Sequence, residues 1–232
     1  MRDLILILAD SKRMLGTRYA EWILGAPELE AGIACASMAQ DEWGHGRLLY
    51  ALLKDFGDDV EQLEHGREPG EYRSMEVLDQ EPGSWTEVVV LNALVDTALT
   101  IQLEALRETE HAPLRQRIGK LLDEEVFHSQ HGTAWLKRLA AGSPEAKREI
   151  ADAIGAVLPQ LVRWFGPGAE GNILRESFLH RISSLMSATG QTAPNPSFDE
   201  FDPVTRRTRG QQPDERTIRR VRGDKNRQFL MD

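Results

Sequence analysis

The sequence predicts an all-α fold, and three observations support this prediction. Apolar residues recur at helical spacing almost everywhere up to residue 189, whereas the alternating pattern of β-strands is scarce. The helical stretches are long, and most of the turns between them are short. A single long polar segment, residues 57–83, interrupts them. With 232 residues, of which 41% are hydrophobic, the chain can bury one substantial core.

Two helices form the first part of the predicted fold. The first spans about residues 3–24 and stops at a Gly-Ala-Pro sequence, and the second spans about residues 28–56. Pro27 suits the first turn of that second helix, and Gly57 ends it. Residues 57–83 are rich in Gly and Pro, which predicts a long crossover loop.

The third and fourth helices complete a predicted four-helix bundle. Ser84 and Glu87 have the spacing of a capping box, which opens a helix that runs to about residue 110. Pro113 begins the fourth helix, which ends at Gly142. One long crossover between the second and third helices, with short turns elsewhere, is typical of the ferritin-like version of the four-helix bundle.

Two additional helices and a C-terminal arm follow the bundle. Ser143 caps a fifth helix that extends to about residue 165, and a Gly-Pro-Gly sequence separates it from a sixth at about residues 170–188. We expect both to pack outside the bundle. No helical period is sustained beyond this point. The sequence therefore predicts a ferritin-like helical domain at residues 1–189 and an extended, Arg-rich arm at residues 190–232.

The net charge of −9 is unevenly distributed along the chain. Residues 205–232 contain nine Arg and Lys against four Asp and Glu, a net charge of +5, which leaves −14 on residues 1–204. An acidic body repels nucleic acid, so nucleic-acid binding is not expected of this protein, and the simplest role for the arm is solvation or docking on a partner.

Cysteine usage and hydropathy indicate the compartment. Cys35 is the single cysteine, so no intrachain disulfide can form, and we expect a cytoplasmic location. The N-terminal apolar run is too short for a secretory signal, and no uncharged apolar stretch reaches the length of a membrane span. We therefore expect no membrane partner.

A Glu-x-x-His pattern occurs twice, as Glu42 with His45 on the second helix and as Glu125 with His128 on the fourth. A residue and its third successor share a helix face, so each carboxylate and imidazole can bind one metal ion together. Asp96 lies in the middle of the third helix, which is apolar on nearly every face. Its carboxyl group must be protonated, paired with a cation or bound to metal, because an isolated ionised carboxylate is very costly to bury.

These residues predict a dimetal carboxylate centre. Carboxylate oxygens combined with imidazole nitrogens, without a thiolate, favour iron or manganese. The predicted metal ligands are Glu42, His45, Asp96, Glu125 and His128. The alternative is a metal-free polar network built from the same side chains.

The first helix is expected to supply a further carboxylate, but the position antiparallel to Glu42 falls near Lys12. Two alternatives remain open for this lysine. Its head group reaches solvent along the helix surface, or it is buried as a cation among the acidic ligands and replaces one metal ion by a network of ion pairs.

Five motifs carry a resemblance to a known family over about residues 10–200. They are EWILGAPELE (21–30), MAQDEWGHGRLLY (38–50), LVDTAL (94–99), EEVFHSQHGTAWLKRL (124–139) and FGPG (165–168). In order and spacing they resemble the ferritin-like subunits of the multicomponent phenylacetyl-CoA epoxidases, the phenylacetic acid catabolic oxygenases. Such enzymes pair a catalytic di-iron subunit with a related subunit that has lost the metal.

The resemblance implies a di-iron, oxygen-dependent monooxygenase subunit. Two iron ions would be held by the five predicted ligands, with Glu42, Asp96 and Glu125 in catalytic roles, and would insert one oxygen atom into an aromatic ring carried as an acyl-CoA. The implied partners are a separate reductase and a related ferritin-like subunit.

One position departs from the family pattern. The first-helix glutamate of the family aligns near Lys12. If Lys12 occupies part of the metal site, the site would hold one iron ion or none. The alternative function is a non-catalytic structural partner subunit with a vestigial or mononuclear site.

Overall fold

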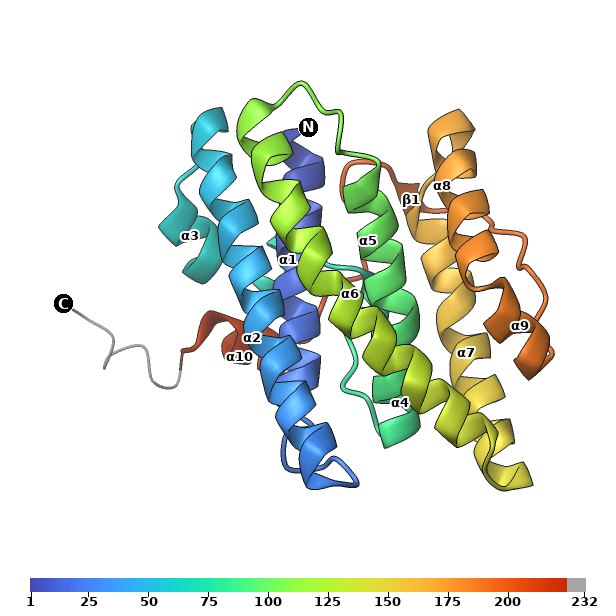
Figure 1. The fold of residues 1–232 in the computed structure, drawn as a ribbon. Helices are drawn as coiled ribbons and strands as arrows, with labels where there is room; N and C mark the ends of the chain where they lie inside the picture. Colours follow the sequence, from blue (N-terminus) through green and yellow to red (C-terminus); the bar gives the residue numbers. More distant parts are fainter. Residues whose placement is uncertain (225–232) are drawn as a thin grey trace. The chain divides into compact units, whose positions relative to one another are not determined.

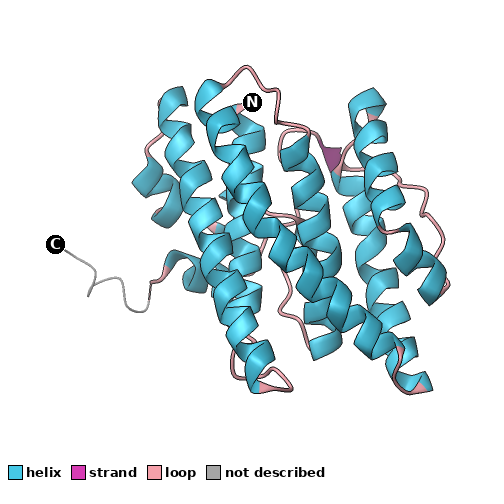
Figure 2. Ribbon diagram, in the orientation of Figure 1, coloured by secondary structure: helices cyan, strands magenta, loops and turns pink. Residues whose placement is uncertain are grey.

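The computed structural model describes residues 1–224, and within them the chain is all-α apart from one short β-hairpin (Figures 1 and 2). Its helices are consistent with the predicted ferritin-like bundle. The chain forms two compact units. The first contains residues 1–81 together with the segment from residue 200 onward, and the second contains residues 82–199.

A pair of antiparallel helices, α1 (Arg2–Ala20) and α2 (Leu29–Leu52), forms the core of the first unit (Figure 1). Glycines allow the two backbones to approach closely. A Cβ atom on Gly46 would lie 3.3 Å from the carbonyl oxygen of Ala9, and one on Gly16 would lie 2.8 Å from the indole of Trp43. The pair therefore depends on the absence of side chains at these two positions.

The segment after α2 differs from the predicted loop. A 3₁₀ turn, η1 (Leu53–Phe56), ends at Gly57, and the short elements α3 (Val60–His65), η2 (Pro69–Glu71) and η3 (Glu76–Leu78) follow. Asp59 explains the unexpected helix α3, because its side chain caps the first turn by accepting a hydrogen bond of 3.2 Å from the backbone N–H of Gln62.

The C-terminal arm also differs from the prediction, since it is not simply extended. It contains a hairpin of β1 (Phe201–Asp202) and β2 (Arg207–Thr208), followed by α10 (Glu215–Arg222). Asp214 caps α10, whose Ile218 and Val221 are buried within the first unit. Residues 225–232 of the predicted arm lie outside the described residues.

The second unit is built from helices in chain order. They are α4 (Trp85–Val90), the π-helical η4 (Leu91–Val95), α5 (Asp96–Glu104), α6 (Ala112–Ala140), α7 (Pro144–Trp164), α8 (Gly168–Arg181) and α9 (Ser183–Thr189). The predicted third helix is therefore interrupted by a π-helical segment, and the predicted sixth helix is divided in two. The predicted cap at Ser84 is confirmed, while Glu87 reaches back to the N–H of Gly83 rather than to that of Ser84.

The continuous segment Trp85–Glu104 is long and apolar enough to cross a membrane by length and composition, with a mean hydropathy of 1.3. Within the most apolar 18-residue stretch of this segment, 78% is buried inside the protein. The same segment carries Asp96. These features are those of a core helix, which satisfies the same length and composition criteria.

Candidate metal centre

Glu42 and His45 of α2 lie on one face of that helix, as their spacing predicts. Their nearest polar atoms, Glu42 Oε1 and His45 Nδ1, are 3.8 Å apart, and both side chains are buried. Lys12 of α1 approaches the same carboxylate, with Nζ 2.9 Å from Oε1 of Glu42. The lysine side chain is 0% exposed, so it does not reach solvent. Of the two positions that the sequence left open for the head group of Lys12, the structure shows the buried one, beside Glu42.

The second unit brings together the other three predicted ligands, Asp96 of α5 with Glu125 and His128 of α6. Each offers a ligand atom that lies within 4.8 Å of those of the other two. His128 Nδ1 is 3.3 Å from Asp96 Oδ2 and 3.8 Å from Glu125 Oε2. All three side chains are buried. A mixed set of carboxylates and imidazole in this compact arrangement can hold a metal ion.

Two further side chains orient these ligands. Asn92 Nδ2 donates to Asp96 Oδ2 at 3.1 Å, and Thr100 Oγ1 donates to Glu125 Oε2 at 3.4 Å. The amide oxygen of Asn92 can only accept, so the 3.0 Å contact from His131 Nδ1 places a proton on that nitrogen. Burial lowers the pKa of His131, with a smaller contribution from His128, which favours the neutral ring.

Sequence reasoning did not identify Asn92 as a site residue. The sequence feature that could have identified Asn92 is its position four residues before Asp96, which places both side chains on one helix face. That signal is weak, because polar residues have this spacing in most helices.

The π-helical segment η4 brings this group close to α6. It directly precedes Asp96, and π-helical turns are frequent at functional sites. Gly132 of α6 packs against it, since a Cβ atom there would lie 2.8 Å from Asn92 Oδ1 and 3.1 Å from Cα of Ala93. Glycine at this position therefore permits the short distance between the two helices.

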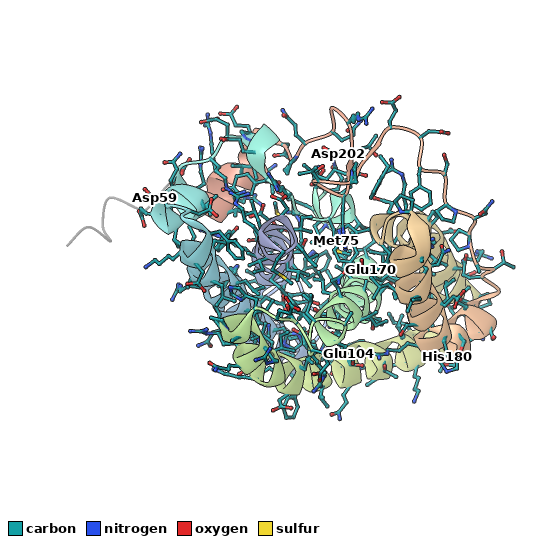
Figure 3. The ribbon with its side chains drawn as sticks, turned by 90° about the horizontal axis from the view of Figure 1, so that it is seen from above. Asp59, Met75, Glu104, Glu170, His180 and Asp202 are labelled. Atoms are coloured by element: carbon teal, nitrogen blue, oxygen red, sulfur yellow. The ribbon has the colours of Figure 1, made fainter. Side chains whose placement is uncertain are left out.

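A cavity of about 300 Å³ in the second unit is lined by Asp96 and Glu125, among other residues. Arg181 and Glu104 also line it and form a two-pronged ion pair, with nitrogen–oxygen distances of 3.1 and 2.7 Å. Figure 3 labels Glu104 of α5 and His180, the residue before Arg181 in α8. A small molecule in this cavity would contact the two carboxylates directly.

A second cavity, of about 260 Å³, is lined by residues of η4 and of α5 to α9, and most of its lining surface is apolar. Thr97, Ser129 and Arg181 line both cavities. The same unit therefore offers a polar chamber beside the carboxylates and a neighbouring apolar one.

Other buried charges in the first unit have a structural role. Asp10 accepts hydrogen bonds from the hydroxyl of Tyr50, from the guanidinium of Arg67 and from the backbone N–H of Arg73. Burial and the charge of Asp10 raise the pKa of Tyr50, which therefore stays protonated. This network fixes the segment after α2 against α1, and the sequence did not predict it.

Two comparisons with known proteins agree with the motifs. The family model described as phenylacetic acid catabolic protein matches residues 1–202. In Escherichia coli (strain K12), one of the subunits of 1,2-phenylacetyl-CoA epoxidase is 27% identical over 198 residues, which are 78% of this chain and 64% of that relative. Another of the subunits of the same enzyme is 26% identical over 149 residues, which are 63% of this chain and 60% of that relative.

The chain thus spans less than two thirds of the length of either relative. From the match of the family model, the chain belongs to the phenylacetic acid catabolic protein family.

Proposed function

We propose that this protein is an iron-dependent, oxygen-using monooxygenase subunit that acts on an aromatic acyl-CoA within a multicomponent enzyme. The observation that carries the proposal is the buried group of Asp96, Glu125 and His128, whose two carboxylates line a cavity. The names of the two similar epoxidase subunits support the reaction class and a related partner subunit. A separate reductase would supply electrons.

In this proposal, Asp96, Glu125 and His128 hold one iron ion, and Glu42 and His45 are the ligands for a second. Bound iron would supply the chemistry that activates dioxygen. The chain's own groups prepare the site: Asn92 orients the Asp96 carboxylate, and the Thr100 hydroxyl donates to Glu125.

The acyl-CoA substrate is expected in the two adjoining cavities. The aromatic ring suits the apolar cavity, which lies next to the carboxylate-lined one through shared lining residues. Apolar walls favour a ring over water, because removing apolar surface from water is favourable. The reacting carbon atoms of the ring would then face the carboxylate-lined cavity across the lining residues that the two cavities share.

A structural partner subunit is the second candidate function. The ion pair between Lys12 and Glu42 favours it, because this pair uses a carboxylate that a second ion would need.

A single-turnover experiment tests the proposed activity. The protein is loaded with excess Fe(II) under argon, reduced chemically, mixed with phenylacetyl-CoA and exposed to ¹⁸O₂, and the thioester products are examined by mass spectrometry. We expect a product that is heavier by one ¹⁸O atom, and none from the Asp96→Ala variant. Iron binding without any oxygenated product would favour the structural role.

A further inference from the structure

The two units contain the same three-position pattern. In the first unit, α2 provides the Glu-x-x-His pair and α1 provides a third side chain, Lys12, beside the glutamate. In the second unit, α6 provides the pair and α5 provides Asp96 beside the histidine. The carboxylate-to-imidazole distance is 3.8 Å for Glu42 and His45 and also 3.8 Å for Glu125 and His128. The backbone geometry thus presents both pairs in the same way.

The third side chain is what differs between the units. In the second unit it is Asp96, whose carboxylate lies 3.3 Å from His128 and adds a negative charge. In the first unit it is Lys12, whose ammonium group lies 2.9 Å from Glu42 and adds a positive one. The third side chain therefore attracts a metal cation in one unit and repels it in the other.

Burial makes this difference large. The side chains of Lys12 and Glu42 are both 0% exposed, so water does not screen the ammonium charge. A metal ion bound by Glu42 would have to share the carboxylate with this ammonium group or displace it. Displacement leaves a lysine head group buried away from its carboxylate, which is itself costly.

We propose that Lys12 acts as an internal cation that competes with metal, so that the two ion positions load unequally and in a fixed order. The position at Asp96, Glu125 and His128 fills first and tightly. The position at Glu42 and His45 fills only when the Lys12 side chain leaves Glu42. This inference rests on the proposed metal-binding function and specifies how the metal site is regulated.

Anaerobic titration with Mn(II), followed by the EPR signal of the free ion, tests the order. The wild-type protein is expected to bind one tight equivalent per chain, with any second equivalent weaker by about 10- to 100-fold or more, the range over which groups around a metal site change its affinity. His128→Ala should remove the tight equivalent, whereas His45→Ala should leave it unchanged. Two equally tight equivalents in the wild type, or loss of the tight one in His45→Ala, would overturn the proposal.

A lysine variant tests the cause. Lys12→Glu supplies the carboxylate that the first unit lacks and should give two tight equivalents. Lys120→Met is the control for loss of a lysine. The side chain of Lys120 on α6 is 73% exposed, and its Nζ lies 3.8 Å from Oε1 of Glu124, which is not one of the proposed ligands. This control should behave as the wild type.

The outcomes separate this inference from the proposed function. If the wild type binds no tight Mn(II), the metal-binding function itself fails. If it binds two equal ions, that function stands and the role of Lys12 is wrong. Should Lys12→Glu fail to fold, as judged by circular dichroism, the wild-type and histidine titrations still decide between these outcomes.

Discussion

Asn92 is hydrogen-bonded to the Asp96 carboxylate and helps to orient it. Its amide group donates to Asp96 and accepts from His131, so both of its polar ends are used. Groups that hydrogen-bond to metal ligands fix the orientation of those ligands and tune their affinity. Asn92 therefore acts on the proposed metal through Asp96.

Replacement of Asn92 by Ala should weaken the tight metal equivalent by about 10- to 100-fold, because Asp96 loses the donor that orients it. The measurement is the Mn(II) dissociation constant of the tight equivalent. Asn172→Ala is the control, since Asn172 is exposed on α8 and contacts only Arg175 among the hydrogen bonds described for it. An unchanged dissociation constant for Asn92→Ala would show that Asn92 does not position the ligand.

The sequence indicates the candidate ligand residues, but it does not indicate their surroundings. Two Glu-x-x-His pairs and one acid in an apolar helix are rare enough together to indicate a site. The position of Lys12 at Glu42 could only be given as one of two alternatives, because a lysine stem packs equally well when its head group reaches solvent. Whether it did so depended on packing between α1 and α2, which local sequence does not encode.

Among the helices, α6 packs closely against the π-helical segment η4 at Gly132. Gly132 has no room for a side chain, whereas a Cβ atom on Gly119 of the same helix would meet nothing within 4 Å. The two glycines thus form a natural pair for comparison.

We predict that Gly132→Ala lowers the free energy of unfolding by about 1 to 3 kcal/mol, the usual cost of overpacking a well-packed contact. Gly119→Ala should be neutral or stabilising by up to about 1 kcal/mol, because alanine is the better helix former. Urea unfolding followed by circular dichroism gives both values. Equal stability of the two variants would contradict the close approach of α6 to η4.

Helix existence and order could be predicted well, and helix interruptions could not. The capping signals at Ser84 and Ser143 are local, and both side chains accept the expected hydrogen bonds. No local residue signals the π-helical turn before Asp96, which packs against Gly132 of α6. The short helix α3 was missed since glycine and proline on either side of it suggested a loop.

Over the full length of the described chain, the segment after residue 200 returns to the unit that the first 81 residues form. Arg207 of β2 is buried, and its guanidinium bonds both carboxylate oxygens of Asp79, at 3.2 and 2.5 Å. Arg18 of α1 also reaches Thr217 of α10 at 3.2 Å. These contacts, between residues more than 120 positions apart, were not predictable from sequence periodicity.

Arg207→Met should destabilise the first unit by about 3 to 5 kcal/mol, because it leaves the buried Asp79 without its cation. Burial already raises the pKa of Asp79 above its ordinary value, so the loss should be larger at neutral pH than near pH 4, where the carboxyl group binds a proton. Urea unfolding at the two pH values measures the difference. Arg216→Met is the control, as that side chain is 72% exposed and lies 3.7 Å from Glu81. A loss as small as that of the control would contradict a structural role for the arm.

Both the proposed function and the loading order require that Asp96, Glu125 and His128 bind a metal ion. Crystals of the protein grown with iron, measured on both sides of the iron absorption edge, show whether they do. We predict an anomalous density peak at coordination distance from these three side chains, which disappears in Asp96→Ala. A wild-type crystal with no peak there, or with iron bound only elsewhere, would contradict metal binding by this group.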